Sequence, residues 1–341
     1  MTSIAAFPPG SDAARVRLVR EWTAPAQARG AVIAIGNFDG VHRGHQAVIG
    51  EAVRLARAAG RPAAVMTFEP HPRRFFKPDG APFLLTRLRT KLRIVAGLGV
   101  DVVYALRFNA RLAALEAEDF VDTILVRGLD AAGIVIGYDF VFGKGRRGNP
   151  ELLRARLAAA GRTCTIMPPV GAAAALEAEE GAIYSSTGAR TALGEGDPQA
   201  AAAILGRPFE IEGHVRAGDR RGRTIGFPTA NIELGDYLRP RLGVYAVRAR
   251  VAGVAAPLDG VANLGLRPTV GGTAPRLEVH LFDFAGDIYG RQVAVALLHF
   301  LRPEMKFAGL DALKVQIAAD AAQARALLAA GPPARKSPPR L

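Results

Sequence analysis

The chain has 341 residues, 50% of them hydrophobic, and a formal net charge of +13. This length exceeds what one average hydrophobic core organises, so we expect two domains. Its single cysteine, Cys164, excludes an intrachain disulfide and a cysteine-based zinc site. No apolar run approaches the roughly 18 residues that span a bilayer, and the N-terminus lacks the pattern of a secretory signal. We expect a soluble cytoplasmic protein without a membrane partner.

The positive charge raises the question of a nucleic-acid partner. The basic residues are spread along the chain, mostly as single arginines, and no basic stripe is interleaved with stacking aromatic residues. Genome composition together with anionic substrates explains the charge more economically, so we expect no nucleic-acid partner.

From residue 31 to about 190, short apolar runs alternate with amphipathic stretches. The runs predict buried strands at 31–36, 62–68, 100–108 and 131–137, and the stretches predict helices at 44–59, 86–99 and 116–129. Strands that alternate with helices predict right-handed crossovers and a Rossmann-like parallel sheet. Ligands of such sheets bind beyond the carboxyl ends of the strands.

The pattern changes in the second half. Residues 191–206 predict a linker with a short alanine-rich helix, and 209–300 contain β-rich segments divided by Gly, Pro and Asp turns. This spacing predicts a small antiparallel β-barrel, followed by a helix at about 309–328. We therefore expect domains at 15–190 and 207–330, joined by the linker, and a disordered Pro- and charge-rich tail at 331–341.

The first candidate site is "GNFDGVHRGH", residues 36–45, which directly follows the first expected strand. It leads into a helix whose N-terminal amides and positive dipole end favour an anion. His42 and His45 share a face there, and two such donors can stabilise the charge that grows on a phosphate in a transition state. A metal site is the alternative, but it needs a third ligand and none is adjacent. Three glycines allow close backbone approach to a phosphate: Gly36, Gly40 and Gly44.

A strand–turn–helix unit bearing H-x-G-H resembles the signature of adenylyl- and cytidylyltransferases. The longer segment resembles the FMN adenylyltransferase module of bacterial FAD synthetases. Further segments resemble that module in the same order: "TFEPHPRRFF" (67–76), "GYDFVFGKGRRG" (137–148) and "YSSTGAR" (184–190). The resemblance implies that His42 and His45 contact the ATP phosphates, with Phe38 and the three glycines beside them.

The same resemblance assigns the remaining residues of this site. It implies flavin binding by Phe68 and His71, nucleotide contact by Asp139, and binding of the β- and γ-phosphates by Ser186, Thr187 and Arg190. The chain departs from the family pattern at two places. Asp139 stands where some members have Asn, and Ile183 and Tyr184 stand where many members carry a basic residue.

The second candidate site combines "GDRRGRTIGFPTANI" (218–232) with "LEVHLFDF" (277–284). Thr229 and Asn231 are two apart, so in an extended segment their oxygen atoms face one side. With nucleotide phosphates, such a pair suits Mg²⁺, which keeps several waters and few protein ligands. Glu278 is a candidate general base for an alcohol, and His280 shares its strand face. A simple turn and an exposed strand face are the alternatives.

These segments resemble the riboflavin kinase domain, together with "GVYAV", "GVANLGLRPTVGG", "IYG" and "LRPEMKFAGLDAL". The resemblance implies that Thr229 and Asn231 bind Mg²⁺–ATP and that Glu278 activates the riboflavin 5′-hydroxyl. It further implies a nucleotide flap with glycines near Gly222 and Gly226.

Together, the two resemblances cover about residues 20–330. They imply a bifunctional enzyme of flavin biosynthesis that phosphorylates riboflavin to FMN and then adenylylates FMN to FAD, with ATP and Mg²⁺ and without a covalent intermediate. We expect a monomer or weak homo-oligomer. A nucleotidyltransferase for another phosphoester is one alternative, which the kinase-like half disfavours. A flavin-binding sensor without catalysis is the other, which the intact His42, His45, Thr229, Asn231 and Glu278 disfavour.

Overall fold

The computed structural model describes residues 16–171, 184–216, 227–269 and 272–331. Its contacts divide the chain into two compact units. The first consists of Met1–Ala81 and Leu88–Tyr184, and the second of Pro82–Arg87 and Ser185–Leu341. Each unit is described by itself below.

The first unit is built on a six-stranded sheet with the order β1-β4-β3-β2-β5-β6, in which every neighbouring pair is parallel. The four expected strands are confirmed as β2 (Val32–Ile35), β3 (Ala63–Glu69), β4 (Val102–Arg107) and β5 (Gly133–Gly137). Two edge strands, β1 (Arg17–Val19) and β6 (Thr163–Met167), were not expected. β1 has three residues and β6 has no fully buried position, so neither carries the long apolar run that predicts a central strand.

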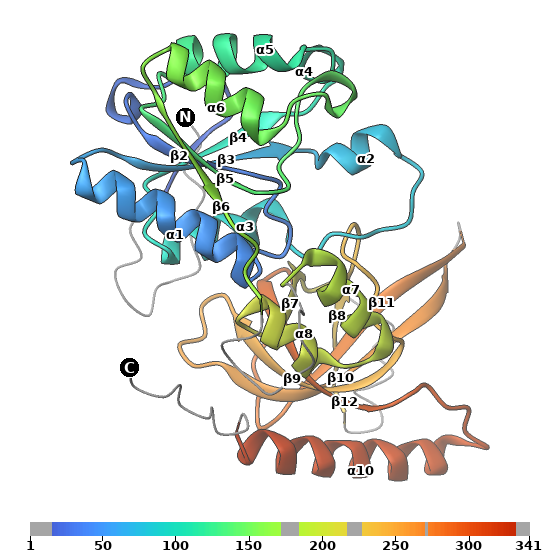
Figure 1. Ribbon diagram of the computed structural model, residues 1–341. Helices are drawn as coiled ribbons and strands as arrows, with labels where there is room; N and C mark the ends of the chain where they lie inside the picture. The colour runs from blue at the N-terminus through green and yellow to red at the C-terminus, as the bar shows by residue number, and fades with distance from the viewer. Residues whose placement is uncertain (1–15, 172–183, 217–226, 270–271, 332–341) are drawn as a thin grey trace. The chain divides into compact units, whose positions relative to one another are not determined.

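Helices cover both faces of this sheet (Figure 1). One face packs on α1 (Arg43–Ala58) and α3 (Leu88–Gly97), through a core that includes Ile49 and Val95. The opposite face packs on segments between β4 and β6, through a core that includes Ile124 and Leu153. The helices there are α4 (Ala110–Ala113), α5 (Ala117–Asp119), η2 (Phe120–Gly128) and α6 (Pro150–Ala159).

The helix expected at 116–129 is present, but its type differs from the prediction. The structure has one turn of α-helix, α5, followed by the π-helix η2. The wider i→i+5 bonding ends where the Leu129 amide donates to the Ile124 carbonyl at 2.7 Å. Hydrophobic periodicity detects the buried face of such a segment but does not distinguish these two helix types.

The second unit contains six antiparallel strands in the order β7-β12-β9-β10-β11-β8. They are β7 (Phe209–His214), β8 (Ala230–Glu233), β9 (Gly243–Val251), β10 (Leu258–Thr269), β11 (Gly272–Leu281) and β12 (Gln292–Arg302). A bridge from Arg216, just after β7, to Asn231 on β8 brings the two ends of this order together. The expected small antiparallel barrel is therefore confirmed, and it is nearly closed.

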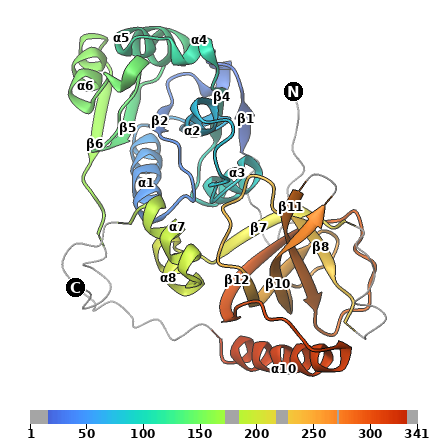
Figure 2. The same ribbon diagram turned by 90° about the vertical axis from the view of Figure 1, so that its right-hand side faces the viewer.

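Three helices complete the second unit. α7 (Ser186–Glu195) and α8 (Pro198–Leu205) add Ala189, Leu193 and Leu205 to the barrel core. α10 (Leu310–Ala329) lies along the outer side of the barrel (Figure 2), where Ala324 and Leu328 pack on Val244 and Phe282. The expected C-terminal helix is confirmed, and the expected disordered tail from 332 onward lies outside the described residues.

Candidate active sites

The turn after β2 places two stacked histidines at the start of α1. His42 is the N-cap of α1, and its Nδ1 accepts the backbone N–H of His45 at 3.3 Å. An Nδ1 that accepts leaves the proton of the neutral ring on Nε2, which can then donate outward. The two imidazoles stack with their centroids 3.6 Å apart and their planes 26° apart. Both rings therefore face the same side of the helix start, as the i, i+3 spacing predicts.

Residues around the pair hold this geometry. The Phe38 ring is 1% exposed and meets the His45 ring edge-on at 5.2 Å. A Cβ on Gly44 would lie 3.1 Å from Cε1 of His42 and 3.4 Å from the Tyr184 carbonyl oxygen. Glycine at position 44 thus lets the His42 ring and the residue-184 backbone approach the helix together. The Phe38 side chain belongs to the core of this turn, where it supports His45.

Arg43, which follows His42 in the sequence, adds a cation to the first turn of α1. Its guanidinium carbon lies 5.7 Å from the centroid of the Tyr184 ring. The first turn of α1 contains no acidic residue. A cation at a helix N-terminus is disfavoured by the helix dipole, so this arrangement suits a bound anion. The motif contains Arg43, but its contact with the Tyr184 ring depends on a residue 141 positions further along the chain, which no local sequence pattern connects to it.

The carboxyl ends of neighbouring parallel strands bring other predicted residues to the same edge. β3, β2 and β5 are adjacent, so the turn after β2 lies beside Phe68 at the end of β3 and Asp139 just after β5. Gly36 directly follows β2, and Gly40, with φ +81°, adopts a left-handed backbone in the turn. Asp139 is exposed, as expected for a residue that contacts a ligand.

An aromatic cluster follows β3. The Phe108 ring lies 5.9 Å from Phe68, 5.3 Å from Phe75 and 5.7 Å from Phe76, all edge-on. Phe76 is 65% exposed, which is unusual for so large an apolar side chain. His71 is the N-cap of α2 (Pro72–Phe76), where its Nδ1 accepts the Arg73 amide at 3.1 Å. Sequence reasoning missed Phe108, which follows β4 and belongs to none of the motifs.

The Ser-Ser-Thr segment forms the start of α7, in the second unit. Ser185 caps the helix by accepting the Gly188 amide at 3.0 Å, so Ser186 and Thr187 occupy its first turn. The Nε of Arg190 donates to the Phe83 carbonyl at 3.0 Å. This bond holds segment 82–87 against α7 within the second unit.

In the barrel, the register aligns the residues predicted for phosphoryl transfer. Glu278 on β11 lies directly opposite Asn231 on β8 and directly opposite Asn263 on β10. Their strand neighbours Ile232, Leu277 and Leu264 are fully buried in the barrel core. Because side chains alternate along strands, the three polar residues point to the outer face. Sequence reasoning missed Asn263, whose Nδ2 lies 3.4 Å from Oε1 of Glu304.

Asn231 has the chemistry expected of a cation ligand. The residue is 5% exposed, and its Oδ1 is buried without a hydrogen-bond partner among the described residues. A buried carbonyl oxygen without a donor is unfavourable unless a ligand satisfies it. Thr229 lies two residues earlier, so the oxygen pair predicted from sequence fits Mg²⁺ in residue type and position. His280 supports this segment, because its Nδ1–H donates to the Pro228 carbonyl at 2.9 Å.

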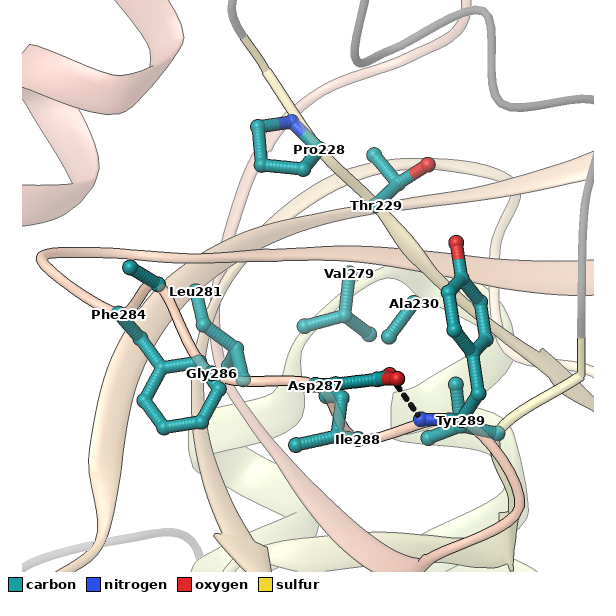
Figure 3. Close-up of a pocket in the computed structure, with 12 residues that line it drawn as sticks. Pro228, Thr229, Ala230, Val279, Leu281, Phe284, Gly286, Asp287, Ile288 and Tyr289 are labelled. Atoms are coloured by element: carbon teal, nitrogen blue, oxygen red, sulfur yellow. Dashed lines mark hydrogen bonds between the residues drawn. The ribbon is translucent and has the colours of Figure 1, made fainter.

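A pocket of about 450 Å³ opens beside this segment. Figure 3 shows Thr229 and Tyr289 with their hydroxyl groups on one side, and the Phe284 ring on the other. Asp287 accepts the Tyr289 amide at 3.0 Å, which shapes the loop that forms this wall. The pocket thus has a mixed polar and apolar wall that includes the predicted metal ligand Thr229. Gly222 and Gly226, predicted for a nucleotide flap, lie outside the described residues.

The parallel sheet is like that of nucleotidyltransferases and the nearly closed antiparallel barrel is like that of riboflavin kinases, so the fold is that of a transferase built from two units. A family model described as FAD synthetase matches residues 24–178, and one described as riboflavin kinase matches residues 205–328. The chain is 46% identical over 300 residues to the bifunctional riboflavin kinase/FMN adenylyltransferase of Escherichia coli (strain K12), covering 88% of this chain and 93% of that protein. The chain belongs to the family of bifunctional riboflavin kinase/FMN adenylyltransferases.

A second relative carries the same description, and one solved structure with a different description matches in fold. The protein of the same description from Bacillus subtilis (strain 168) is 40% identical over 299 residues, covering 86% of this chain and 91% of that protein. A crystal structure described as a macrolide-efflux protein from Streptococcus pneumoniae matches with a TM-score of 0.76 and 32% identity, over 89% of this chain and 97% of that one. Among the described residues, every helix is too short or too polar to cross a membrane.

Proposed function

We propose that this chain makes FAD from riboflavin in two ATP-dependent steps. Residues 207–330 would phosphorylate riboflavin to FMN, and residues 15–190 would adenylylate FMN to FAD, with 191–206 as the linker. One observation carries the proposal: both family models match within one chain, with the histidine turn inside the first matched part and the Glu278–Asn231 pair inside the second.

In the kinase step, Glu278 is the general base. Its carboxylate takes the proton of the riboflavin 5′-hydroxyl while that oxygen attacks the γ-phosphorus of ATP, and ADP leaves. The opposed Asn231 and Asn263 limit where the carboxylate can point, because directly opposite residues in antiparallel strands have Cβ atoms about 5 Å apart. Positioning of the two substrates supplies much of the rate.

Thr229 and Asn231 are the residues that would hold Mg²⁺. The buried, unsatisfied Oδ1 of Asn231 supports this role. Mg²⁺, when bound, would neutralise charge on the nucleotide phosphates. The adjoining pocket is proposed to receive the base of ATP, since Phe284, Ile288 and Tyr289 offer apolar and aromatic surface beside Thr229.

In the adenylyl step, a phosphate oxygen of FMN attacks the α-phosphorus of ATP, and pyrophosphate leaves. His42 donates from Nε2 and His45 from its stacked ring to phosphate oxygens that gain charge in the transition state. The amide groups at the start of α1 and the Arg43 guanidinium add positive potential. No covalent enzyme intermediate is required.

The other predicted residues keep supporting roles in the proposal. Phe68, His71 and the aromatic cluster around Phe108 form a surface for the isoalloxazine ring. Gly36, Gly40, Gly44 and Phe38 form the turn at the phosphates, and Asp139 contacts the nucleotide. Ser186, Thr187 and Arg190 hold the β- and γ-phosphates, and Gly222 and Gly226 belong to the kinase flap. A cytoplasmic monomer or weak homo-oligomer fits enzymes that use ATP and vitamin-derived substrates.

The test is a chromatographic time course with purified full-length protein, riboflavin, ATP and Mg²⁺. We expect FMN to rise first and then to convert to FAD. FMN that accumulates without FAD would refute the adenylyltransferase assignment. Flavin binding without turnover would favour a sensor instead.

A further inference from the structure

A buried lysine lies beneath the histidine turn and belongs to none of the motifs. Lys91 on α3 is 4% exposed. Its Nζ donates to the Asn37 carbonyl at 2.6 Å and to Oγ1 of Thr67 at 3.1 Å. The Thr67 hydroxyl donates to the same Asn37 carbonyl at 3.0 Å. Two side chains from two elements thus converge on one backbone oxygen of the turn.

That oxygen lies where the turn is most constrained. Asn37 precedes Phe38, whose φ of 48° is unusual for a bulky residue, and Gly40 and Val41 are also left-handed. The Phe38 ring in turn supports His45. Movement of the Asn37 carbonyl would therefore shift the backbone that carries both histidines.

The lysine is held there against an energetic penalty. Burial lowers the pKa of the Lys91 ammonium, while the nearby carboxylates of Asp39 and Glu69 raise it. Asp39 is itself 2% exposed. Two carboxylates beside a site for a polyanion would repel the ligand unless a cation balances them. A buried lysine with this cost and this location indicates a role beyond packing.

We propose that Lys91 is a positioning residue of the adenylyltransferase site. Lys91 and Thr67 together hold the Asn37 carbonyl in place. The positive charge of Lys91 also balances the negative charges of Asp39 and Glu69, so that a nucleoside triphosphate can approach. The proposal rests on the proposed adenylyl transfer. It adds a residue that acts through the turn and does not touch substrate.

The decisive variants are Thr67→Val and Thr67→Ser in the full-length protein. Valine has the shape of threonine without the hydroxyl, whereas serine keeps the hydroxyl. We expect Thr67→Val to lower kcat for conversion of FMN to FAD about tenfold, because small displacements of catalytic groups cost one to two orders of magnitude. Thr67→Ser should stay within about twofold of wild type, and the riboflavin kinase rate should be unchanged in both.

Lys91→Met tests the charge, with Lys314→Met on the exposed α10 as the matched control. We expect Lys91→Met to lower kcat at least as much as Thr67→Val and also to raise KM for ATP several-fold, while Lys314→Met changes neither. If Lys91→Met fails to fold, the comparison of Thr67→Val with Thr67→Ser still tests the inference. Equal adenylylation by Thr67→Val and Thr67→Ser would overturn the inference. Wild-type protein without FMN adenylylation would instead overturn the proposed function.

Discussion

His42 caps the start of α1, and we propose that it also donates to phosphate; the two tasks can be separated. Its Nδ1 accepts the His45 amide as an N-cap, and in the proposed mechanism its Nε2–H donates to phosphate. The capping task needs only a short acceptor, whereas the proposed chemical task needs the imidazole. A substitution that keeps the cap and removes the imidazole therefore distinguishes the capping task from the proposed chemical task.

We predict that His42→Asn abolishes FAD formation with little change in stability. Asparagine is a good N-cap, so the helix start is kept, while His42→Ala should also destabilise the first unit by about 1 kcal/mol. The measurement pairs FMN adenylylation with denaturant unfolding of both variants. If His42→Asn retained adenylylation, the imidazole would be a cap and not a phosphate donor.

The junction of α1, β3 and β4 shows how elements hold the sheet edge opposite the site. The Asp101 carboxylate, just before β4, accepts from Nη1 of Arg57 at 2.8 Å and from the Ala63 amide at 2.8 Å. Arg57 also donates to the Gly99 carbonyl at 2.9 Å. The hydrogen bond from Arg57 is the main reason that the pKa of Asp101 is lowered, with burial opposing it.

We predict that Asp101→Asn lowers the free energy of unfolding by about 1 kcal/mol at pH 7, a modest value because the carboxylate is 42% exposed and screened by solvent. A depressed folded-state pKa gives stability that is present above the unfolded value and lost as pH falls through the folded value. The difference between wild type and variant should therefore shrink below pH 3.8, the ordinary value for this group. Urea unfolding at pH 7 and pH 3 checks this, and a difference as large at pH 3 as at pH 7 would contradict it.

For the whole molecule, the proposed catalytic residues lie in different units, His42 in the first and Glu278 in the second, so we predict that the two activities can be separated by substitution. Glu278→Ala should lose FMN formation while it still converts added FMN to FAD. His42→Ala should still form FMN from riboflavin but should not convert it to FAD.

A mixture of the two variants, supplied with riboflavin and ATP, should make FAD, because FMN released by one molecule can reach the other. The double variant is the control and should make neither product. A mixture that makes FMN but no FAD would show that FMN does not pass between molecules.

The local geometry of the histidine turn and the order of strands and helices could be predicted from the sequence alone. The strand, the turn and the helix start of "GNFDGVHRGH" are neighbours in sequence, so the i, i+3 spacing of His42 and His45 already predicted that they share a face. The alternation of apolar runs and helices likewise predicted the parallel sheet, and the β-rich second half predicted the barrel. These features depend on periodicity and short-range geometry, which a sequence carries directly. The roles of the individual residues stay predictions.

Only the tertiary structure decided which distant residues meet. Asn231 faces Glu278 because β8 pairs with β11 in one register, and a slip of one residue would turn Glu278 into the core. Lys91 reaches Asn37 because α3 packs on the sheet beside the turn after β2. Such contacts are selected by the burial of many side chains at once, so no local pattern specifies them. The sequence by itself therefore determined the class of chemistry, whereas long-range packing decided which side chains support it.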